Sequence, residues 1–237
     1  TLSEIIMEEI PQCEVAVLCG PSHAEEVGKE IPTSLVAGAK KRATAELVQN
    51  TFMSEVLRVY TSPDVLGMEI GASLKNVIAL AAGMADGLGY GDNTKAALIT
   101  RGISEMGRLA IAMGAKYETL SGLTGMGDLI VTCASKHSRN RRAGYLMGQG
   151  YTMQQAMDEV KMVVEGVYSA KAAIALAKKY HVDMPIIEQV NEVLFGDHQP
   201  PLSTDFYSNI FGKKIDNFTA KDTATWYSTP YVIWANY

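Results

Sequence analysis

The first 62 residues alternate between short apolar runs and amphipathic segments. Three runs read as buried or half-buried strands, at 14–19 (EVAVLC), 33–39 (TSLVAGA) and 56–62 (VLRVYTS). The segments between them, 24–30 and 42–53, read as helices, and in the second one Ala45, Val48 and Phe52 stand at inward positions. Strands that alternate with helices predict an α/β sheet that is at least partly parallel.

From Pro63 onward the strand pattern stops. Residues 64–84 are apolar with few polar breaks, which predicts a helix buried on most sides. Residues 93–113 place apolar side chains at steps of three and four, and the polar residues between them predict an amphipathic helix with a solvated face. That polar set is Arg101, Ser104, Glu105 and Arg108.

Further helix signals follow along the chain. Thr152 and Gln155 have the spacing of a capping box, and helices are predicted at 168–180 and 186–195, with Pro185 suited to a helix start and Gly196 to a stop. The second half therefore reads as an all-α domain whose boundary lies near Ser62-Pro63. The sequence predicts three parts: 1–62, 63–196 and an atypical tail, 197–237, which holds both tryptophans and lacks a helical period.

Composition places the chain among soluble globular proteins. Of its 237 residues, 47% are hydrophobic and 20% are charged, and the net charge is -5, so any anion site is local and the surface as a whole does not suit nucleic acid. The three cysteines form no metal-binding spacing, so we expect free thiols, no metal and a cytoplasmic location.

Targeting and membrane signals are weak as well. The acidic N-terminus does not read as a signal peptide, and the apolar runs are too short for membrane insertion. Because the first residue is Thr1 and not Met, we expect either a processed N-terminus or a piece of a longer chain.

Lys75 stands out because it lies in an apolar helix, within GASLKNVIALAAG. Burying an ammonium group is costly unless it is paired. Two interpretations remain open at this point. Lys75 either reaches the surface or pairs with a nearby acid, or it is a desolvated lysine that serves as general base or acid for a substrate hydroxyl.

The stretch LTGMGDLIVTCASKHSRNRR, residues 123–142, places glycines and Asp128 before a cluster of cations. The glycines allow a sharp backbone path that presents Asp128 to a cleft, although tight turns alone would explain them. The cations of 136–142 read either as a solvated helix start or as an anion site in which Arg139 holds phosphate and Ser138 and Asn140 add uncharged donors. A helix that begins near Ser138 would add free backbone N–H groups. The patch is short and lacks aromatic residues, which disfavours nucleic acid.

A third candidate is GPSHAEE, residues 20–26, between a predicted strand and a predicted helix. Ligands of open α/β sheets bind at the carboxyl ends of strands, so Gly20 and Ser22 are cleft candidates, although a plain turn would look the same. His23 alone supports no catalytic role, and the other histidines, His137, His181 and His198, have no evident metal partners.

Together these segments resemble the bacterial NAD(P)-dependent glycerol-3-phosphate dehydrogenase family. The matching stretches are VAVLCGPSHAEEV, GASLKNVIALAAGMADGLGYGDNTKAALITRG, LTGMGDLIVTCASKHSRNRRAG and MVVEGVYSA, which together span roughly residues 1–196. The resemblance implies the rear half of a Rossmann-type dinucleotide-binding domain, followed by a helical substrate domain of the 6-phosphogluconate dehydrogenase C-terminal type. It implies reversible hydride transfer between NAD(P)H and dihydroxyacetone phosphate, which supplies glycerol 3-phosphate for phospholipid synthesis.

The resemblance also implies roles for individual residues. Lys75 matches the family's proton acceptor and contacts substrate, and Arg139 matches a position that contacts both substrate and cofactor. The other matches to substrate positions are Gly20, Ser22, Asp128, Ser138 and Asn140. The other matches to cofactor positions are Ala24, Val163 and Glu165.

Two departures from the family pattern limit these expectations. The chain lacks the strand, GxGxxG loop and helix that hold the pyrophosphate, so we expect little or no turnover from the isolated chain. Residues 197–237 do not resemble the family's C-terminal helix, which favours a frameshifted or fused tail over a divergent extension.

Several alternatives therefore stay open. The chain is either a dehydrogenase fragment, a related dehydrogenase for another small substrate, or a non-catalytic fragment that binds phosphate metabolites or a protein partner. The preference for NAD or NADP and the existence of a homodimer are also undecided.

Overall fold

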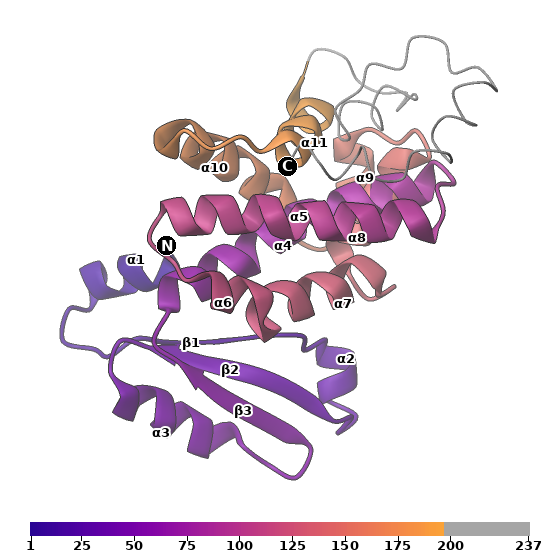
Figure 1. The fold of residues 1–237 in the computed structure, drawn as a ribbon. Helices are drawn as coiled ribbons and strands as arrows, with labels where there is room; N and C mark the ends of the chain where they lie inside the picture. Colours follow the sequence, from indigo (N-terminus) through magenta and orange to yellow (C-terminus); the bar gives the residue numbers. More distant parts are fainter. Residues whose placement is uncertain (197–237) are drawn as a thin grey trace, which may run out of the picture. The chain divides into compact units, whose positions relative to one another are not determined.

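The three predicted strands form one mixed sheet in the computed structural model of this protein, which describes residues 1–196 (Figure 1). The predictions made for 197–237 lie outside the described residues. The strands are β1 (Ala16–Cys19), β2 (Thr33–Ala39) and β3 (Leu57–Ser62), in the order β1-β2-β3. β1 pairs antiparallel with β2, and β2 pairs parallel with β3, so the predicted partly parallel sheet is confirmed.

The helices α1 (Leu2–Glu9), α2 (Ala24–Val27) and α3 (Arg42–Phe52) accompany the sheet. Of these, α2 and α3 lie within the predicted segments 24–30 and 42–53. α3 packs against the strands, with Ala45 buried and Val48 half-buried as expected. The inward position expected for Phe52 is wrong, because this residue ends the helix and keeps 50% of its surface exposed. The buried contact of α3 therefore lies in its first turns.

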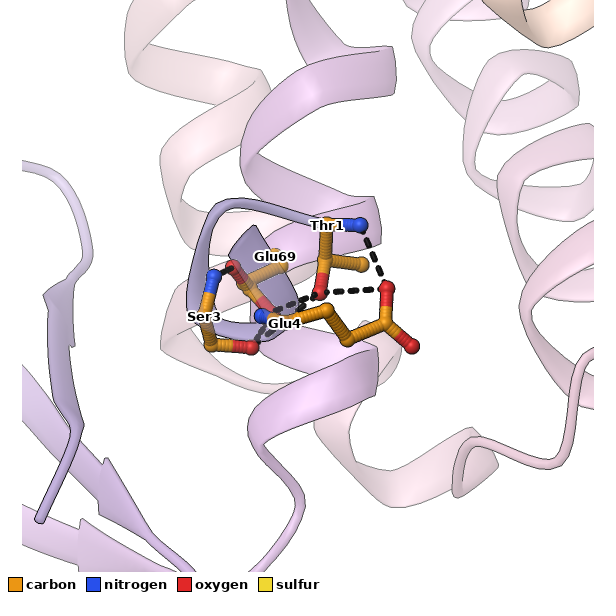
Figure 2. Close-up of polar contacts among 4 residues, drawn as sticks. All are labelled: Thr1, Ser3, Glu4 and Glu69. Atoms are coloured by element: carbon orange, nitrogen blue, oxygen red, sulfur yellow. Dashed lines mark hydrogen bonds and ion pairs between the residues drawn. The ribbon is translucent and has the colours of Figure 1, made fainter. Parts of the chain in front are cut away.

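The short helix α1, which the apolar pattern did not predict, is fastened to the helical part of the protein. The Ser3 backbone N–H and hydroxyl donate to the two carboxylate oxygens of Glu69 at 2.8 and 2.6 Å, and Ser3 is buried (Figure 2). Thr1 and Glu4 close the N-terminus of α1 with a capping box. Because Glu69 lies on the long helix α4 (Val65–Gly87), this contact joins the segment that precedes the sheet to the core of the helical part.

α4 is the central helix. It contacts α5, α7, α8, α10 and α11 and also touches β1 and β2. Met68, Ile78, Leu80 and Met84 are fully buried in it, which confirms the predicted buried helix. By length and composition α4 could cross a membrane, but 67% of its most apolar window is buried by the rest of the protein, as in the core helix of a globular domain.

The other helices surround α4, and the described residues after Ser62 contain no strand. They are α5 (Asp92–Ala112), α6 (Tyr117–Ser121), a π-helical turn η1 (Leu123–Gly127), α7 (Asp128–Ala134), α8 (Arg139–Gly148), α9 (Met153–Val160), α10 (Glu165–Tyr180) and α11 (Pro185–Phe195). The capping box of Thr152 with Gln155 and the proline at the first position of α11 are confirmed.

The axes of α4 and α8 approach so closely that their backbones touch. A Cβ atom added at Gly83 of α4 would stand 2.0 Å from the Arg141 carbonyl oxygen. A Cβ atom added at Gly144 of α8 would stand 2.1 Å from the Leu80 carbonyl oxygen. Only residues without a side chain allow this crossing, which fixes the position of α8 against α4.

Glu105 of α5 is buried, so its expected place on the solvated face is wrong. Its side chain is 1% exposed and accepts hydrogen bonds from the backbone N–H groups of Ile186 at 2.8 Å and Ile187 at 3.3 Å. These N–H groups belong to the first turn of α11, and such groups have no acceptor within their own helix. Burial raises the pKa of Glu105 to about 7, while the two N–H groups and the charges of Arg108 and Arg101 act in the opposite direction.

This raised pKa makes the stability of the fold depend on pH. An unfolded Glu105 loses its proton near pH 4.5, whereas the folded one keeps it to about 7. Between these values the folded state binds more protons, so the free energy of unfolding falls as pH rises, by about 3 kcal/mol at most. Glu105→Gln keeps an acceptor oxygen without titrating, and we expect it to flatten this decline in urea unfolding at pH 5, 6, 7 and 8.

The matched control is Glu118→Gln on α6, which replaces an exposed glutamate and is expected to leave the pH profile as in the wild type. Parallel pH profiles of the wild type and Glu105→Gln would contradict the assignment.

Candidate functional site

A cleft of about 270 Å³ lies where the turn after β1 meets α4, α7 and the first turns of α8 and α10. It brings together eight of the ten residues that the sequence singles out: Gly20, Ser22, Lys75, Asp128, Ser138, Arg139, Asn140 and Glu165. Five further residues line it: His23, Ala72, Asn76, Thr132 and His137. Ala24, the exposed first residue of α2, and Val163, which is 60% exposed ahead of α10, do not line it.

The turn after β1 depends on Gly20. Its φ of +144° lies in a region that side chains rarely adopt, and an added Cβ would stand 3.1 to 3.3 Å from atoms of Leu35 and Ser34. The Ser22 hydroxyl donates to the Gly20 carbonyl oxygen at 3.1 Å. The glycine thus lets the chain leave the sheet and form one wall of the cleft.

Lys75 of α4 forms an ion pair with Asp128, with 2.5 Å between Nζ and Oδ2. The side chains are 18% and 5% exposed, so the pair is largely withdrawn from water. Burial raises the pKa of Asp128, and the Lys75 charge and the hydroxyl of Thr132 act against that shift. Of the two interpretations of Lys75, pairing with an acid is observed, and the lysine nevertheless lines the cleft.

The glycines ahead of Asp128 form the turn η1, and Asp128 is the first residue of α7. The predicted sharp path that presents this carboxylate to a cleft is therefore present. Thr132 lies one helical turn further along α7, and its hydroxyl donates to the Asp128 carbonyl oxygen at 2.6 Å. Thr132 was not predicted as a cleft residue, although it stands four residues after Asp128 and therefore on the same face of the helix.

α8 begins at the predicted place. Ser138 is its N-cap, and the Ser138 hydroxyl oxygen accepts from the Arg141 backbone N–H at 3.2 Å. Asn140 is buried, and its Oδ1 accepts from the Gly166 N–H at 2.8 Å. Asn140 thus ties the first turn of α8 to the first turn of α10, so its carbonyl oxygen is engaged within the protein.

Arg139 forms an ion pair with Glu165 across the cleft, with 2.5 Å between Nη2 and Oε1. Both side chains are 38% exposed. An ion pair that water reaches contributes little to stability, about 1 kcal/mol or less. The guanidinium can therefore exchange this partner for an anionic ligand without a large loss of stability.

Some of the cations at 136–142 line the cleft, and others pair with carboxylates outside it. Arg141 and Lys95 both pair with Asp86, at 2.6 and 2.8 Å, and Arg142 lies 3.8 Å from Glu159. Of the cluster, His137 and Arg139 line the cleft. The anion-site interpretation therefore narrows to Arg139, Ser138 and the start of α8.

Two of the three cysteines have thiols with raised pKa values. Burial, chiefly, raises the pKa of Cys19 to about 11 and that of Cys133 to about 12, so both thiols stay protonated at neutral pH. All three cysteines are free. Within residues 1–196, no three His, Cys, Asp or Glu side chains gather in a group that could hold a metal ion.

The geometry supports a specific chemistry. A lysine–carboxylate pair, which can exchange a proton with a ligand, lies in the same cleft as an arginine and a helix N-terminus, which attract anions. The arrangement therefore suits a small anionic substrate that gains or loses a proton.

Comparison with known families matches most of the chain. Residues 64–204 match the family described as NAD-dependent glycerol-3-phosphate dehydrogenase C-terminus, and residues 1–45 match its N-terminus counterpart.

Individual proteins agree with this result. The chain is 74% identical over 197 residues to a glycerol-3-phosphate dehydrogenase [NAD(P)+] from Agathobacter rectalis, covering 83% of this chain and 59% of the relative. It is 64% identical over 197 residues to the protein of that name from Fusobacterium nucleatum, covering 82% and 59%. The crystal structure of glycerol-3-phosphate dehydrogenase from Coxiella burnetii superposes with a TM-score of 0.82 at 38% identity, covering 88% of this chain and 62% of that one. The chain thus spans about three-fifths of the length of the curated relatives it matches.

Proposed function

This chain belongs to the NAD-dependent glycerol-3-phosphate dehydrogenase family, and from that premise we propose that its cleft is the substrate site for reversible hydride transfer between NAD(P)H and dihydroxyacetone phosphate. The observation that carries the proposal is the presence of the Lys75–Asp128 pair and Arg139 in one cleft. The product in the reducing direction, glycerol 3-phosphate, would serve phospholipid synthesis in the cytoplasm.

The phosphate group of the substrate would lie at the start of α8. Arg139 can bind two phosphate oxygens at once, and the free backbone N–H groups of the first turn add donors and the positive end of the helix dipole. The hydroxyl of Ser138 can still donate its proton while its oxygen accepts from Arg141. These groups recognise a phosphate ester better than a neutral polyol.

Lys75 would handle the proton of the reaction. In the reducing direction its ammonium donates a proton to the ketone oxygen at C2 while hydride reaches the same carbon. In the oxidising direction the amine takes the proton of the C2 hydroxyl. Asp128, which pairs with Lys75, holds the ammonium group in place and is itself shielded from water.

We expect residues of this chain to contact one side of a nicotinamide dinucleotide. Val163 offers an exposed apolar side chain two residues before Glu165, and Arg139 and Glu165 are both partly open to solvent. Together with Ala24, these residues would hold either NAD or NADP. The bound nicotinamide ring supplies or accepts the hydride, and this chain orients the substrate toward it.

Arg139→Ala tests the phosphate site directly. We expect isothermal calorimetry to show glycerol 3-phosphate binding to the 237-residue chain, and the substitution to weaken it about 10- to 100-fold, because a charge-assisted hydrogen bond to phosphate is lost. Glycerol, which lacks the phosphate, should not bind measurably.

The matched control is Arg142→Ala. Arg142 is a neighbouring arginine on the same helix, and its partner Glu159 lies 3.8 Å away with both side chains 55% exposed. It should leave the affinity within about threefold of the wild type. Absence of binding heat in the wild type would overturn the proposal. Binding without NADPH oxidation by the isolated chain is the expected result, since the chain carries no GxGxxG loop.

A further inference from the structure

His23 lies on the wall of the cleft in the turn between β1 and α2. Its Nε2 atom is buried and makes no hydrogen bond with any of residues 1–196. His23 also occupies the N-cap position of α2, but its side chain makes no capping hydrogen bond. The Nε2 atom of His23 therefore has no hydrogen-bond partner among the described residues.

A buried nitrogen without a partner is unfavourable, because it has lost its hydrogen bonds to water and gained none in exchange. Such atoms are rare in folded proteins and call for an explanation at each occurrence. Here the atom belongs to a residue that lines a polar cleft, whose other walls carry Lys75, Arg139 and the start of α8. A ligand in the cleft is the simplest partner for it.

The neighbours of His23 show which part of a ligand it would meet. The ring of His137 lies 6.0 Å away, centroid to centroid, and His137 directly precedes Ser138, the N-cap of α8. His23 thus faces the anion-binding start of α8 from the opposite, sheet-side wall. The charged groups that line the same cleft are Lys75, Asp128, Arg139 and Glu165, and Asp128 is close enough to His23 for their charges to interact.

We propose that His23 is a further substrate-binding residue, whose Nε2–H donates a hydrogen bond to a phosphate oxygen of the ester bound in the cleft. This inference rests on the proposed function and names one more contact of the same site. A neutral imidazole suffices, because one of its two nitrogens carries a proton. The sheet part would then bind the phosphate through His23, and the helical part would bind it through Arg139.

Three substitutions at this position separate the hydrogen bond from the shape of the ring. His23→Phe keeps a ring without nitrogen, His23→Asn places an amide near Nδ1, and His23→Gln places an amide nitrogen near Nε2. We expect calorimetry with glycerol 3-phosphate to give about tenfold weaker binding for Phe and Asn. The Gln variant should stay within about threefold of the wild type. Unchanged binding by His23→Phe, or equal loss in all three variants, would overturn the proposal.

Nuclear magnetic resonance of the imidazole nitrogens provides the second readout. We expect the Nε2 resonance of His23 to shift when glycerol 3-phosphate is added at constant pH, and not when glycerol is added. His181, which does not line this cleft, serves as the internal reference. Binding heat that Arg139→Ala removes, with an unmoved His23 resonance, would overturn this inference and leave the proposed function standing. No heat and no shift would overturn both.

Discussion

Gly144→Ala is expected to destabilise the protein by about 3 kcal/mol or more, beyond the usual cost of an overpacked methyl group. The new Cβ would lie 2.1 Å from the Leu80 carbonyl oxygen and 3.0 Å from the Met84 backbone nitrogen. Both atoms belong to the backbone of α4, which cannot turn aside as a flexible side chain can. α8 must therefore move away from α4, and urea unfolding of the purified variant measures the cost.

The same displacement should weaken the site, because Arg139 and its N-cap Ser138 lie at the start of α8 while Lys75 lies on α4. We expect weaker glycerol 3-phosphate binding by whatever fraction of Gly144→Ala remains folded. The matched control is Gly107→Ala in the interior of α5, where a Cβ would meet only the Tyr117 ring at 3.8 Å. This variant should be neutral or more stable by up to about 1 kcal/mol, because alanine favours helix. Equal effects at the two glycines would contradict the close-packing argument.

Local elements of this fold were predictable because their signals are local. β2 occupies the predicted residues 33–39, and the buried helix predicted at 64–84 corresponds to α4. Period-two and period-3.6 patterns report which faces are buried, and caps such as Thr152 report where a helix begins. The same rules failed at α1, because its apolar side chains Leu2 and Ile5 are exposed. This helix is held instead by the polar contact between Ser3 and Glu69.

Long-range polar contacts were not predictable from the pattern. Glu105 reads as a solvated residue because its partners, the N–H groups of Ile186 and Ile187, lie on another helix far along the chain. The sequence singled out Lys75 and Asp128 separately, one for its apolar setting and one for its glycine neighbours, but their ion pair required the fold. In the same way, the sequence does not show that Arg141 has a different partner from Arg139. Arg141 pairs with Asp86, which lies far away along the chain.

Lys75→Met is expected to lower turnover by about 10²- to 10⁴-fold, because it removes the group that we propose exchanges a proton with the substrate oxygen. Turnover is measured in a chimera that joins this chain to the remaining portion of the 74% identical relative, with dihydroxyacetone phosphate and NADPH. The substitution also leaves Asp128, 3% exposed, without its cation. Breaking a buried pair in this way costs about 3 to 5 kcal/mol, so the variant should also be less stable.

The stability loss and the chemical loss can be separated by a second substitution. Asp128→Asn added to Lys75→Met removes the unpaired buried charge, so the double variant should regain stability while turnover stays low. Lys95→Met is the matched control, since Lys95 is 19% exposed, pairs with Asp86 at 2.8 Å, and does not line the cleft. It should keep turnover within about threefold, because Asp86 retains Arg141 as a partner. Recovery of turnover in the double variant would show that Lys75 acts only by neutralising Asp128, and would remove it from the proton transfer.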